Sequence, residues 1–238
     1  MNLISIDFWN TIVVAHTNGE ERHKARYDAL IERAAGYNES LTKDRIDQAH
    51  TYASQRFDEI WIDEQRTPNS PELVAFTLEK LGIRFSENET AEITRIYEES
   101  LMDGPPDLAP GVADAVKHLS EKYKLAIISD TMFSPGRVLR EFLHGHDILQ
   151  YFSAFSFSDE VGVSKPHPKM YKKVLSETGT GVSGSFHIGD MQRTDITGAK
   201  AMGMGAILYT GVNESDKDQT TADHVLSEWD NIAELLIK

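Results

Sequence analysis

The spacing of hydrophobic and polar residues changes along the chain and separates a short apolar start from a long helical stretch. Residues 3–8, LISIDF, form an apolar run broken by Asp7, and its length and isoleucine content predict a buried strand. From about residue 19 to residue 102 the apolar positions recur at helical intervals, for example at Ile46 and Ala49. This stretch predicts three or four successive helices with no strand between them.

Several residues in the helical stretch have the chemistry of helix ends. Ser70 followed by Pro71 predicts an N-cap with proline at the first helical position, and Gly82 predicts the end of that helix. Ser86 and Glu89 have the spacing of a capping box, in which each side chain bonds the backbone N–H of the other residue. These signals predict two of the helices and support an all-helical segment.

After residues 104–111, GPPDLAPG, the pattern changes to an alternation of helices and strands. The expected helices cover residues 111–122, 135–144, 168–178 and 195–202. The expected strands cover residues 124–129, about 154–158, 185–190 and 205–210. This alternation predicts an α/β fold with a doubly wound, Rossmann-like parallel sheet. We expect the core to comprise residues 1–15 and 104–238, and an inserted all-helical domain to comprise residues 16–103.

Composition and charge narrow the class of protein. The chain has 238 residues, of which 40% are hydrophobic and 26% charged, as in folded soluble proteins. No stretch approaches the roughly 20 apolar residues of a membrane helix, and MNLISIDF lacks a basic leader, so we expect a cytoplasmic protein. The absence of cysteine excludes disulfides, zinc–thiolate sites and cysteine catalysis. A net charge of −14 disfavours nucleic acid and anionic lipid as partners, so an anionic ligand would need a local site with a metal.

Acidic and hydroxyl side chains lie where the expected strands end. Asp7 ends the first strand, Ser129 and Asp130 end the second, and Asp190 ends SFHIGD. Lys165 lies in the loop after the strand expected at about residues 154–158. In an open α/β sheet, ligands bind beyond the carboxyl ends of the strands. Carboxylates beside a lysine suit a hard cation such as Mg²⁺ next to a phosphate, with one carboxylate available as a nucleophile.

These residues and their order along the chain resemble the four motifs of the haloacid dehalogenase superfamily of hydrolases. The resemblance extends over essentially the whole chain. The matching segments are Asp7-Phe8-Trp9-Asn10-Thr11, Ser129, Lys165-Pro166-His167-Pro168, and Gly189-Asp190 followed by Asp195. The helical insertion resembles the cap domain of that family. The resemblance implies a hydrolase that uses Mg²⁺ as cofactor and a small phosphorylated molecule as substrate, which the cap would select.

The resemblance also implies a role for each matched residue. Asp7 would be the nucleophile that forms an aspartyl-phosphate, with Thr11 and Lys165 as further catalytic residues. Lys165 would neutralise charge on the nucleophile and on the phosphate. The residues that would bind phosphoryl oxygens are Asn10, Ser129 and Asp130. The residues that would hold Mg²⁺ are Asp7, Trp9 through its backbone carbonyl, Asp190 and, behind them, Asp195.

Trp9 departs from the pattern of phosphatases in that family, which carry a second aspartate two residues after the nucleophile. That aspartate protonates the leaving group and then activates water, and such assistance is worth roughly 10²–10⁴-fold. His16, His23 and Asp130 are candidates to replace it by position, and acyl or aryl phosphates would suffer least from its loss. Asn10 stands where glycine is frequent, a mild change because asparagine tolerates positive φ.

Three alternatives to a Mg²⁺-dependent phosphatase stay open. The haloacid dehalogenases also carry an aromatic residue at the place of Trp9, but they work without metal and lack the Gly189-Asp190 pattern. Phosphonate hydrolases keep Mg²⁺ and need a cap lysine, for which Lys24 and Lys43 are available. A non-catalytic binding protein on the same scaffold is the third, and the retention of all the motif residues argues against it. We favour the phosphatase.

Two other features have ordinary explanations. Phe57, Ile60 and Trp61 lie on one helix and are expected to pack within the cap rather than to contact a substrate. Residues 179–184, GTGVSG, match G-x-G-x-x-G, but they follow an expected helix and precede a strand, whereas a dinucleotide-binding motif follows a strand and opens a helix. We therefore expect residues 179–184 to form a plain loop.

Overall fold

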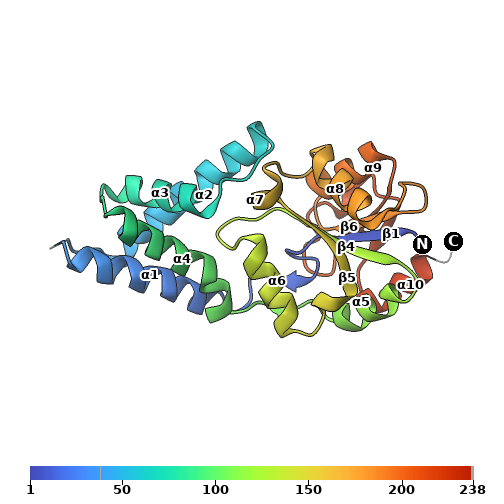
Figure 1. The fold of residues 1–238 in the computed structure, drawn as a ribbon, viewed down its shortest axis with the longest axis horizontal. Coiled ribbons are helices and arrows are strands. Elements are labelled where there is room, and N and C mark those ends of the chain that lie inside the picture. The colour runs from blue at the N-terminus through green and yellow to red at the C-terminus, as the bar shows by residue number, and fades with distance from the viewer. Residues whose placement is uncertain (38, 237–238) are drawn as a thin grey trace.

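The computed structural model describes residues 1–37 and 39–236, and in this part of the chain six parallel strands form one sheet (Figure 1). The order of the strands is β5-β4-β1-β6-β7-β8, with β1 between β4 and β6. The strands are β1 (Leu3–Ile6), β4 (Lys124–Ser129), β5 (Phe152–Phe157), β6 (Phe186–Gly189), β7 (Gly205–Tyr209) and β8 (His224–Leu226). Because the strands run in the same direction, their carboxyl ends meet along one edge, as the predicted α/β fold requires.

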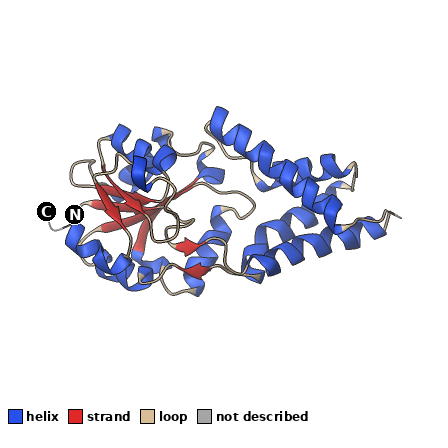
Figure 2. Ribbon diagram, turned by 180° about the vertical axis from the view of Figure 1, so that it is seen from behind, coloured by secondary structure: helices blue, strands red, loops and turns tan. Residues whose placement is uncertain are grey.

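Helices cover both faces of the sheet (Figure 2), which confirms the doubly wound arrangement. On one face lie α5 (Val112–Ser120), α6 (Gly136–Gly145) and α10 (Ile232–Leu235), and on the other lie α8 (Pro168–Thr178) and α9 (Thr197–Met202). Side chains of β4 alternate between the two layers: Ile127 packs in the first, and Ala126 and Ile128 pack in the second. The strand is thus buried on both faces, as its apolar sequence indicates.

The segment between β1 and β4 forms a helical unit with its own core (Figure 1). Its helices are α1 (Gly19–Ala35), α2 (Lys43–Asp63), α3 (Ser70–Leu81) and α4 (Glu87–Asp103), in agreement with the predicted helical block. Phe133, from the loop after β4, enters this core and links the two units. We call the helical unit the cap, and we propose residues 16–103 as its extent and residues 1–15 and 104–238 as the core domain.

The ends of α3 and α4 confirm the predicted capping box and the predicted end of α3, and they correct the predicted N-cap of α3. Ser86 and Glu89 form the predicted capping box of α4, and Gly82 ends α3 with a φ of 70°, which favours glycine. The predicted N-cap at Ser70 is wrong, because Asn69 accepts the N–H of Glu72 and caps α3 instead. The Ser70 hydroxyl donates to the carbonyl oxygen of Phe133 at 2.9 Å and so tethers the cap to the core.

Several short elements were not predicted, although the expected boundaries in residues 111–210 agree with the observed ones within two residues. Strands β2 (Val13–Val14) and β3 (Asp107–Leu108) pair in antiparallel fashion where the chain enters and leaves the cap. A π-helical turn precedes α9, where the sequence predicted an earlier helix start. The remaining elements are α7 (Ser158–Val161), the π-helical η2 (Gln192–Ile196), and the 3-10 turns η1 (Leu149–Tyr151), η3 (Lys217–Gln219) and η4 (Trp229–Asn231). Elements of two to five residues are too short to establish a period.

Two further expectations concern the loop at residues 179–184 and membrane-spanning helices. Residues 179–184 lie in the connection between α8 and β6, so their glycine motif forms a loop as predicted. Within the described residues, every helix is too short or too polar to cross a membrane.

Candidate active site

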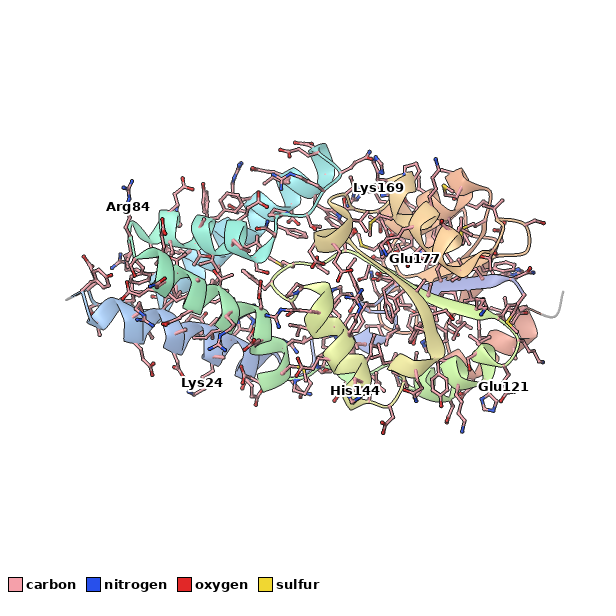
Figure 3. The ribbon with its side chains drawn as sticks, in the orientation of Figure 1. Lys24, Arg84, Glu121, His144, Lys169 and Glu177 are labelled. Atoms are coloured by element: carbon pink, nitrogen blue, oxygen red, sulfur yellow. The ribbon has the colours of Figure 1, made fainter. Side chains whose placement is uncertain are left out.

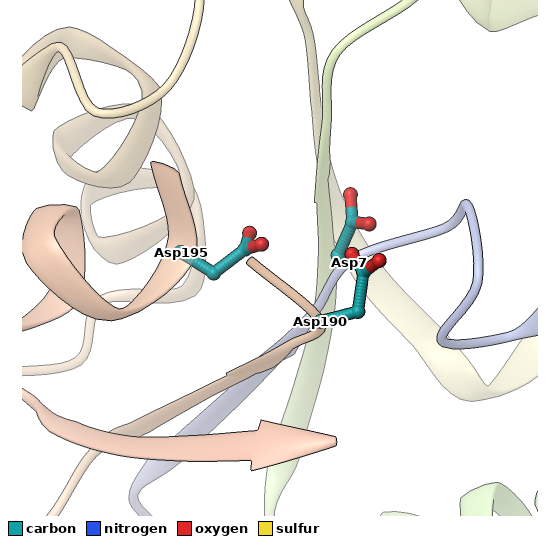
Figure 4. Close-up of side chains that lie close together, drawn as sticks. All are labelled: Asp7, Asp190 and Asp195. Carbon is teal, nitrogen blue, oxygen red and sulfur yellow. The ribbon is translucent and has the colours of Figure 1, made fainter. Parts of the chain in front are cut away.

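Three carboxylates meet at the carboxyl edge of the sheet because they follow paired strands or the turn beside them. Asp7 directly follows β1 and Asp190 directly follows β6, and these strands pair with Ile6 opposite Ile188. Asp195 comes from the π-helical turn after β6. One oxygen from each of the three carboxylates lies within 4.8 Å of the others (Figure 4). The structure therefore brings together the acids that the sequence placed in one site.

Lys165 bridges two of the three acids. Its Nζ lies 2.5 Å from Oδ1 of Asp7 and 2.7 Å from Oδ1 of Asp195, and the lysine is only 3% exposed. Burial by itself lowers the pKa of Lys165, but the charges of Asp195 and Asp7 outweigh it and raise the pKa well above its usual value. Lys165 is therefore a permanent cation that holds one oxygen of Asp7 and leaves the other available.

Asp195 is held from several sides. The Nε2 of the buried His187 lies 3.0 Å from Oδ1 of Asp195, and Nδ1 of His187 lies 2.9 Å from the hydroxyl of Ser5. The backbone N–H of Met191 donates to the other carboxylate oxygen at 3.1 Å. Burial would raise the pKa of Asp195, but Lys165 and His187 together hold it below its usual value. Asp195 is thus a fixed anion that orients the lysine.

Gly189 is required by the closeness of Asp195. A Cβ at position 189 would lie 2.2 Å from Cγ of Asp195, so any side chain there would displace the carboxylate. The Gly-Asp pattern of the sequence thus has a steric basis: the glycine admits Asp195, and the following residue supplies Asp190.

The remaining two acids carry charge that the protein compensates only in part. Burial raises the pKa of Asp7 well above its usual value, against the opposing effect of Lys165. Burial and the charge of Asp195 raise the pKa of Asp190 to about 6. Three adjacent carboxylates share one ammonium group, so a cation is needed for Asp7 and Asp190 to be fully ionised. The oxygen donors of Asp7 and Asp190, with Asp195 beside them, fit a hard divalent cation such as Mg²⁺.

A pocket of about 320 Å³ opens onto these acids between the core and the cap. Trp9, Phe57, Trp61 and Phe133 give it aromatic walls. Phe57 packs against the cap core as expected, and both Phe57 and Trp61 also line the pocket, whereas Ile60 is buried and is not part of the pocket wall. The residues that line the pocket are Asp7, Trp9, Asn10, Arg26, Phe57, Trp61, Asp130, Thr131, Met132, Phe133, Lys165, Asp190, Met191, Thr194 and Asp195.

Three residues were candidates to replace the second aspartate as proton donor: Asp130, His16 and His23. Of these, Asp130 lines this pocket. Its Oδ1 accepts the backbone N–H of Lys165 at 2.9 Å, and its Oδ2 accepts the indole N–H of Trp61 at 2.8 Å. Burial raises the pKa of Asp130, against the opposing effect of Lys165. His16 is exposed, and His23 lies in a separate groove on the cap surface.

Three further predicted residues follow β1 or end β4. Asn10 lines the pocket and has a φ of 53°, which confirms that this turn needs a residue tolerant of positive φ. Thr11 and Ser129 are fully buried and are not part of the pocket wall. The hydroxyl of Thr11 has no hydrogen-bond partner among the described residues, and that of Ser129 donates to the carbonyl oxygen of Asp130 at 3.2 Å. Their predicted roles in catalysis and phosphate binding stay predictions.

Sequence reasoning missed two polar residues of the site. Asn213 donates from Nδ2 to Oδ2 of Asp190 at 2.8 Å, and it lies just beyond the carboxyl end of β7. The strand-end rule that identified Asp7 would have found Asn213 had it been applied to β7. Arg26 reaches the pocket from α1, and no signal in the sequence distinguishes it from other cap arginines.

Comparison with known sequences identifies a protein family and several related proteins. Residues 42–209 match the family model described as Haloacid dehalogenase-like hydrolase. The chain is 23% identical to haloacid dehalogenase-like hydrolase domain-containing protein 3 of Mus musculus over 234 residues, which cover 95% of this chain and 90% of that protein. It is 30% identical to glyceraldehyde 3-phosphate phosphatase of Pyrococcus furiosus over 131 residues, which cover 53% of each chain.

Comparison with solved structures supports the fold over the whole chain. The 2-haloacid dehalogenase of Pseudomonas syringae pv. Tomato superposes with a TM-score of 0.75 at 20% identity, covering 99% of this chain and 98% of that one. The HAD-hydrolase YfnB of Bacillus subtilis, in a structure bound to magnesium, superposes with a TM-score of 0.67 at 17% identity, covering 100% and 99%. At these identities the likeness concerns the fold.

Proposed function

The chain belongs to the haloacid dehalogenase-like hydrolase family, and from this premise we propose that it is a Mg²⁺-dependent phosphatase with Asp7 as its nucleophile. The observation that carries the proposal is the pair of contacts from Lys165 to Asp7 and Asp195, next to the uncompensated carboxylate of Asp190. This arrangement suits a bound cation beside a phosphate. The likeness to a glyceraldehyde 3-phosphate phosphatase supports a small phosphorylated substrate.

In the first step, the free oxygen of Asp7 attacks phosphorus. A bond forms between Asp7 and phosphorus, the bond from phosphorus to the leaving oxygen breaks, and the leaving group departs with its electron pair. Lys165, fixed by Asp195, holds the other oxygen of Asp7 and offsets negative charge as the phosphoryl group approaches. Mg²⁺, when bound by Asp7, Asp190 and the backbone carbonyl of Trp9, supplies positive charge to the phosphoryl oxygens.

In the second step, water attacks phosphorus of the aspartyl-phosphate. The bond between phosphorus and Asp7 breaks, inorganic phosphate is released with the oxygen and one proton of the water, and Asp7 is regenerated. The second proton of the water returns to the group that protonated the leaving group in the first step. We place Asn10, Ser129 and the backbone at Asp130 around the phosphoryl oxygens, with Thr11 supporting the turn that carries Asp7. These assignments follow the motif positions and are part of the proposal.

The proposed mechanism needs a residue other than Trp9 to donate a proton to the leaving group. Trp9 has no acidic proton to give, and Asp130 is the acid in the pocket outside the Lys165 and metal cluster. Burial raises the pKa of Asp130, which favours its protonated form at a higher pH than for an exposed aspartate. We propose Asp130 as the residue that protonates the leaving group of alkyl phosphates.

Release of inorganic phosphate tests the function. Acetyl phosphate, p-nitrophenyl phosphate and glycerol 3-phosphate are incubated with the protein with and without Mg²⁺, and the variant Asp7→Asn serves as control. We expect release that requires both Mg²⁺ and Asp7 and that decreases as the leaving group becomes more basic. Equal rates for wild type and Asp7→Asn, or no release from any of the three compounds, contradict the proposal.

A 2-haloacid dehalogenase is the second candidate, because Trp9 places an aromatic ring in the pocket beside Asp7. Chloride release from 2-chloropropionate without Mg²⁺ distinguishes it from the phosphatase. Phosphonate hydrolysis has less support, since Lys24 and Lys43 line a groove on the cap surface, separate from the pocket that contains Asp7.

A further inference from the structure

Arg26 lines the active-site pocket although it belongs to the cap. It lies on α1, and the same pocket contains Asp7 and Asp190 from the core. Its Nε donates to the hydroxyl of Ser100 at 2.9 Å, and its guanidinium carbon lies 4.5 Å from the ring centroid of Phe133. These two contacts hold the guanidinium in place and leave its terminal nitrogens for a ligand.

Arg26 lacks an acidic partner within the part of the chain that the structure describes. Three other cap arginines pair with an acid, Arg33 with Glu89, Arg56 with Glu59, and Arg66 with Glu72, whereas no ion pair involves Arg26. Among the other cap arginines without an ion pair, Arg22 and Arg45 donate to backbone carbonyls, and Arg84 and Arg95 are exposed. Burial lowers the pKa of Arg26 to about 10, so the group stays cationic at neutral pH. A partly desolvated cation without a counter-ion favours an anion in the space that it faces.

The phosphate group of the substrate does not explain the unpaired positive charge of Arg26. In the proposed function, the phosphoryl group occupies the end of the pocket where Lys165 contacts Asp7 and where the acids would hold Mg²⁺. Arg26 contributes to the wall from the cap, next to Phe133, and the rest of that wall is apolar or aromatic apart from Asp130 and Thr131. A pocket of about 320 Å³ is at the small end of ligand sites, so the second anion belongs to a compact molecule.

We propose that Arg26 is a specificity-determining residue that binds a carboxylate of the substrate. The substrate class is then the phosphate monoester of a small hydroxy acid, with the phosphate at Asp7 and the carboxylate at Arg26. Arginine suits this role because its planar guanidinium can bind a carboxylate through two parallel hydrogen bonds. The inference rests on the proposed phosphatase function and names the substrate class of that same site.

A matched pair of substrates tests the role of Arg26. 3-Phosphoglycerate and glycerol 3-phosphate have the same carbon skeleton and differ in a carboxylate against a hydroxymethyl group. For the Mg²⁺-loaded wild type we expect kcat/KM to favour 3-phosphoglycerate by about 10- to 100-fold, the range of one charge-assisted contact. In Arg26→Gln we expect this preference to disappear through a higher KM for 3-phosphoglycerate, with glycerol 3-phosphate changed by less than about threefold. Arg26→Lys should restore part of the preference.

Lys24→Gln is the control for the change in charge. Lys24 lies on the same helix, its side chain is 75% exposed at the outer side of the cap (Figure 3), and it is not part of the pocket wall. We expect it to keep the wild-type preference. Binding of the two compounds to Asp7→Asn, measured by calorimetry, gives a readout that needs no turnover, and the double variant with Arg26→Gln should lose the tighter binding of 3-phosphoglycerate.

The possible failures have different meanings. Equal kcat/KM for the two substrates in the wild type overturns the assignment of Arg26 and leaves the phosphatase intact. An equal loss on both substrates in Arg26→Gln also overturns it, because Arg26 then acts on the phosphate. If Arg26→Gln does not fold, the ratio of kcat/KM for the two substrates in the wild type and in Arg26→Lys decides whether Arg26 binds a carboxylate. If neither compound nor p-nitrophenyl phosphate is hydrolysed, the phosphatase is wrong, and the calorimetric preference still decides whether Arg26 binds a carboxylate.

Discussion

The indole N–H of Trp61 donates a 2.8 Å hydrogen bond to Oδ2 of Asp130, and this bond joins the cap to the core at the pocket. The other carboxylate oxygen of Asp130 accepts the backbone N–H of Lys165 at 2.9 Å. The guanidinium of Arg193 lies 3.9 Å from the ring centroid of Trp61. A single aspartate therefore connects the position of the cap to the loop that supplies the lysine of the active site.

Loss of the Trp61 hydrogen bond should loosen the closed pocket. In Trp61→Phe, Asp130 loses a donor to a buried carboxylate, which costs about 1–3 kcal/mol in the free energy of unfolding. We expect KM to increase about tenfold, since the cap would close less often over the substrate. Urea unfolding and steady-state phosphate release check both effects, with Ile62→Ala, an exposed position on the same helix, as control. An unchanged KM contradicts a role for this bond in closure.

Removal of Lys165 should destabilise the protein without metal more than the protein with metal. In Lys165→Met the carboxylates of Asp7 and Asp195 lose their buried counter-charge, and breaking such a pair costs about 3–5 kcal/mol. We expect Mg²⁺ to raise the melting temperature of the variant more than that of the wild type, because it supplies the missing charge. Phosphate release should be lost in both conditions. Lys172→Met, at an exposed position, is the matched control. Wild-type stability of Lys165→Met without metal would contradict this account.

An aspartate at position 9 should protonate the leaving group more effectively than Asp130, whose two carboxylate oxygens already accept N–H groups. Trp9 lines the pocket two residues after Asp7, so we expect Trp9→Asp to increase hydrolysis of glycerol 3-phosphate by about 10²-fold and that of acetyl phosphate little. Trp9→Asn has nearly the same size without the acidic proton and should show no increase. Equal rates for the two variants contradict this prediction and mean that an acid at position 9 adds nothing to the proton that Asp130 supplies.

Binding of Mg²⁺ should weaken below about pH 6. Burial and the charge of Asp195 raise the pKa of Asp190 from 3.8 to about 6, so the metal-free folded state holds this proton longer than the unfolded state. Its contribution to stability is present at low pH and is lost as the pH rises through 6. Mg²⁺ competes with the proton, so its affinity should fall about tenfold per pH unit below 6. Calorimetric titration with Mg²⁺ between pH 5 and 7 checks this, and an affinity independent of pH in that range contradicts it.

The sequence alone determined the fold class and the acidic cluster, because both depend on local periodicity and on a general property of parallel sheets. Strands and helices alternate visibly from residue 111 onward, and carboxyl ends of parallel strands share an edge. Asp7 and Asp190 were therefore expected at the same edge of the sheet, and the pairing of β1 with β6 in the structure makes them neighbours. Asp195 followed from the motif. The N-cap at Ser70 was misassigned because Asn69 offers the same chemistry one residue earlier, and only the contact of Ser70 with Phe133 shows its use.

The tertiary structure alone decided what covers the acids. Trp61 and Asp130 are 69 residues apart, and Arg26 belongs to a helix whose pattern shows which face is apolar but not what packs against it. Helical periodicity describes one element at a time, whereas the docking of the cap depends on contacts between elements distant in sequence. For this reason the acids of the proposed nucleophile and metal site could be predicted from the sequence, and the walls of the pocket could not.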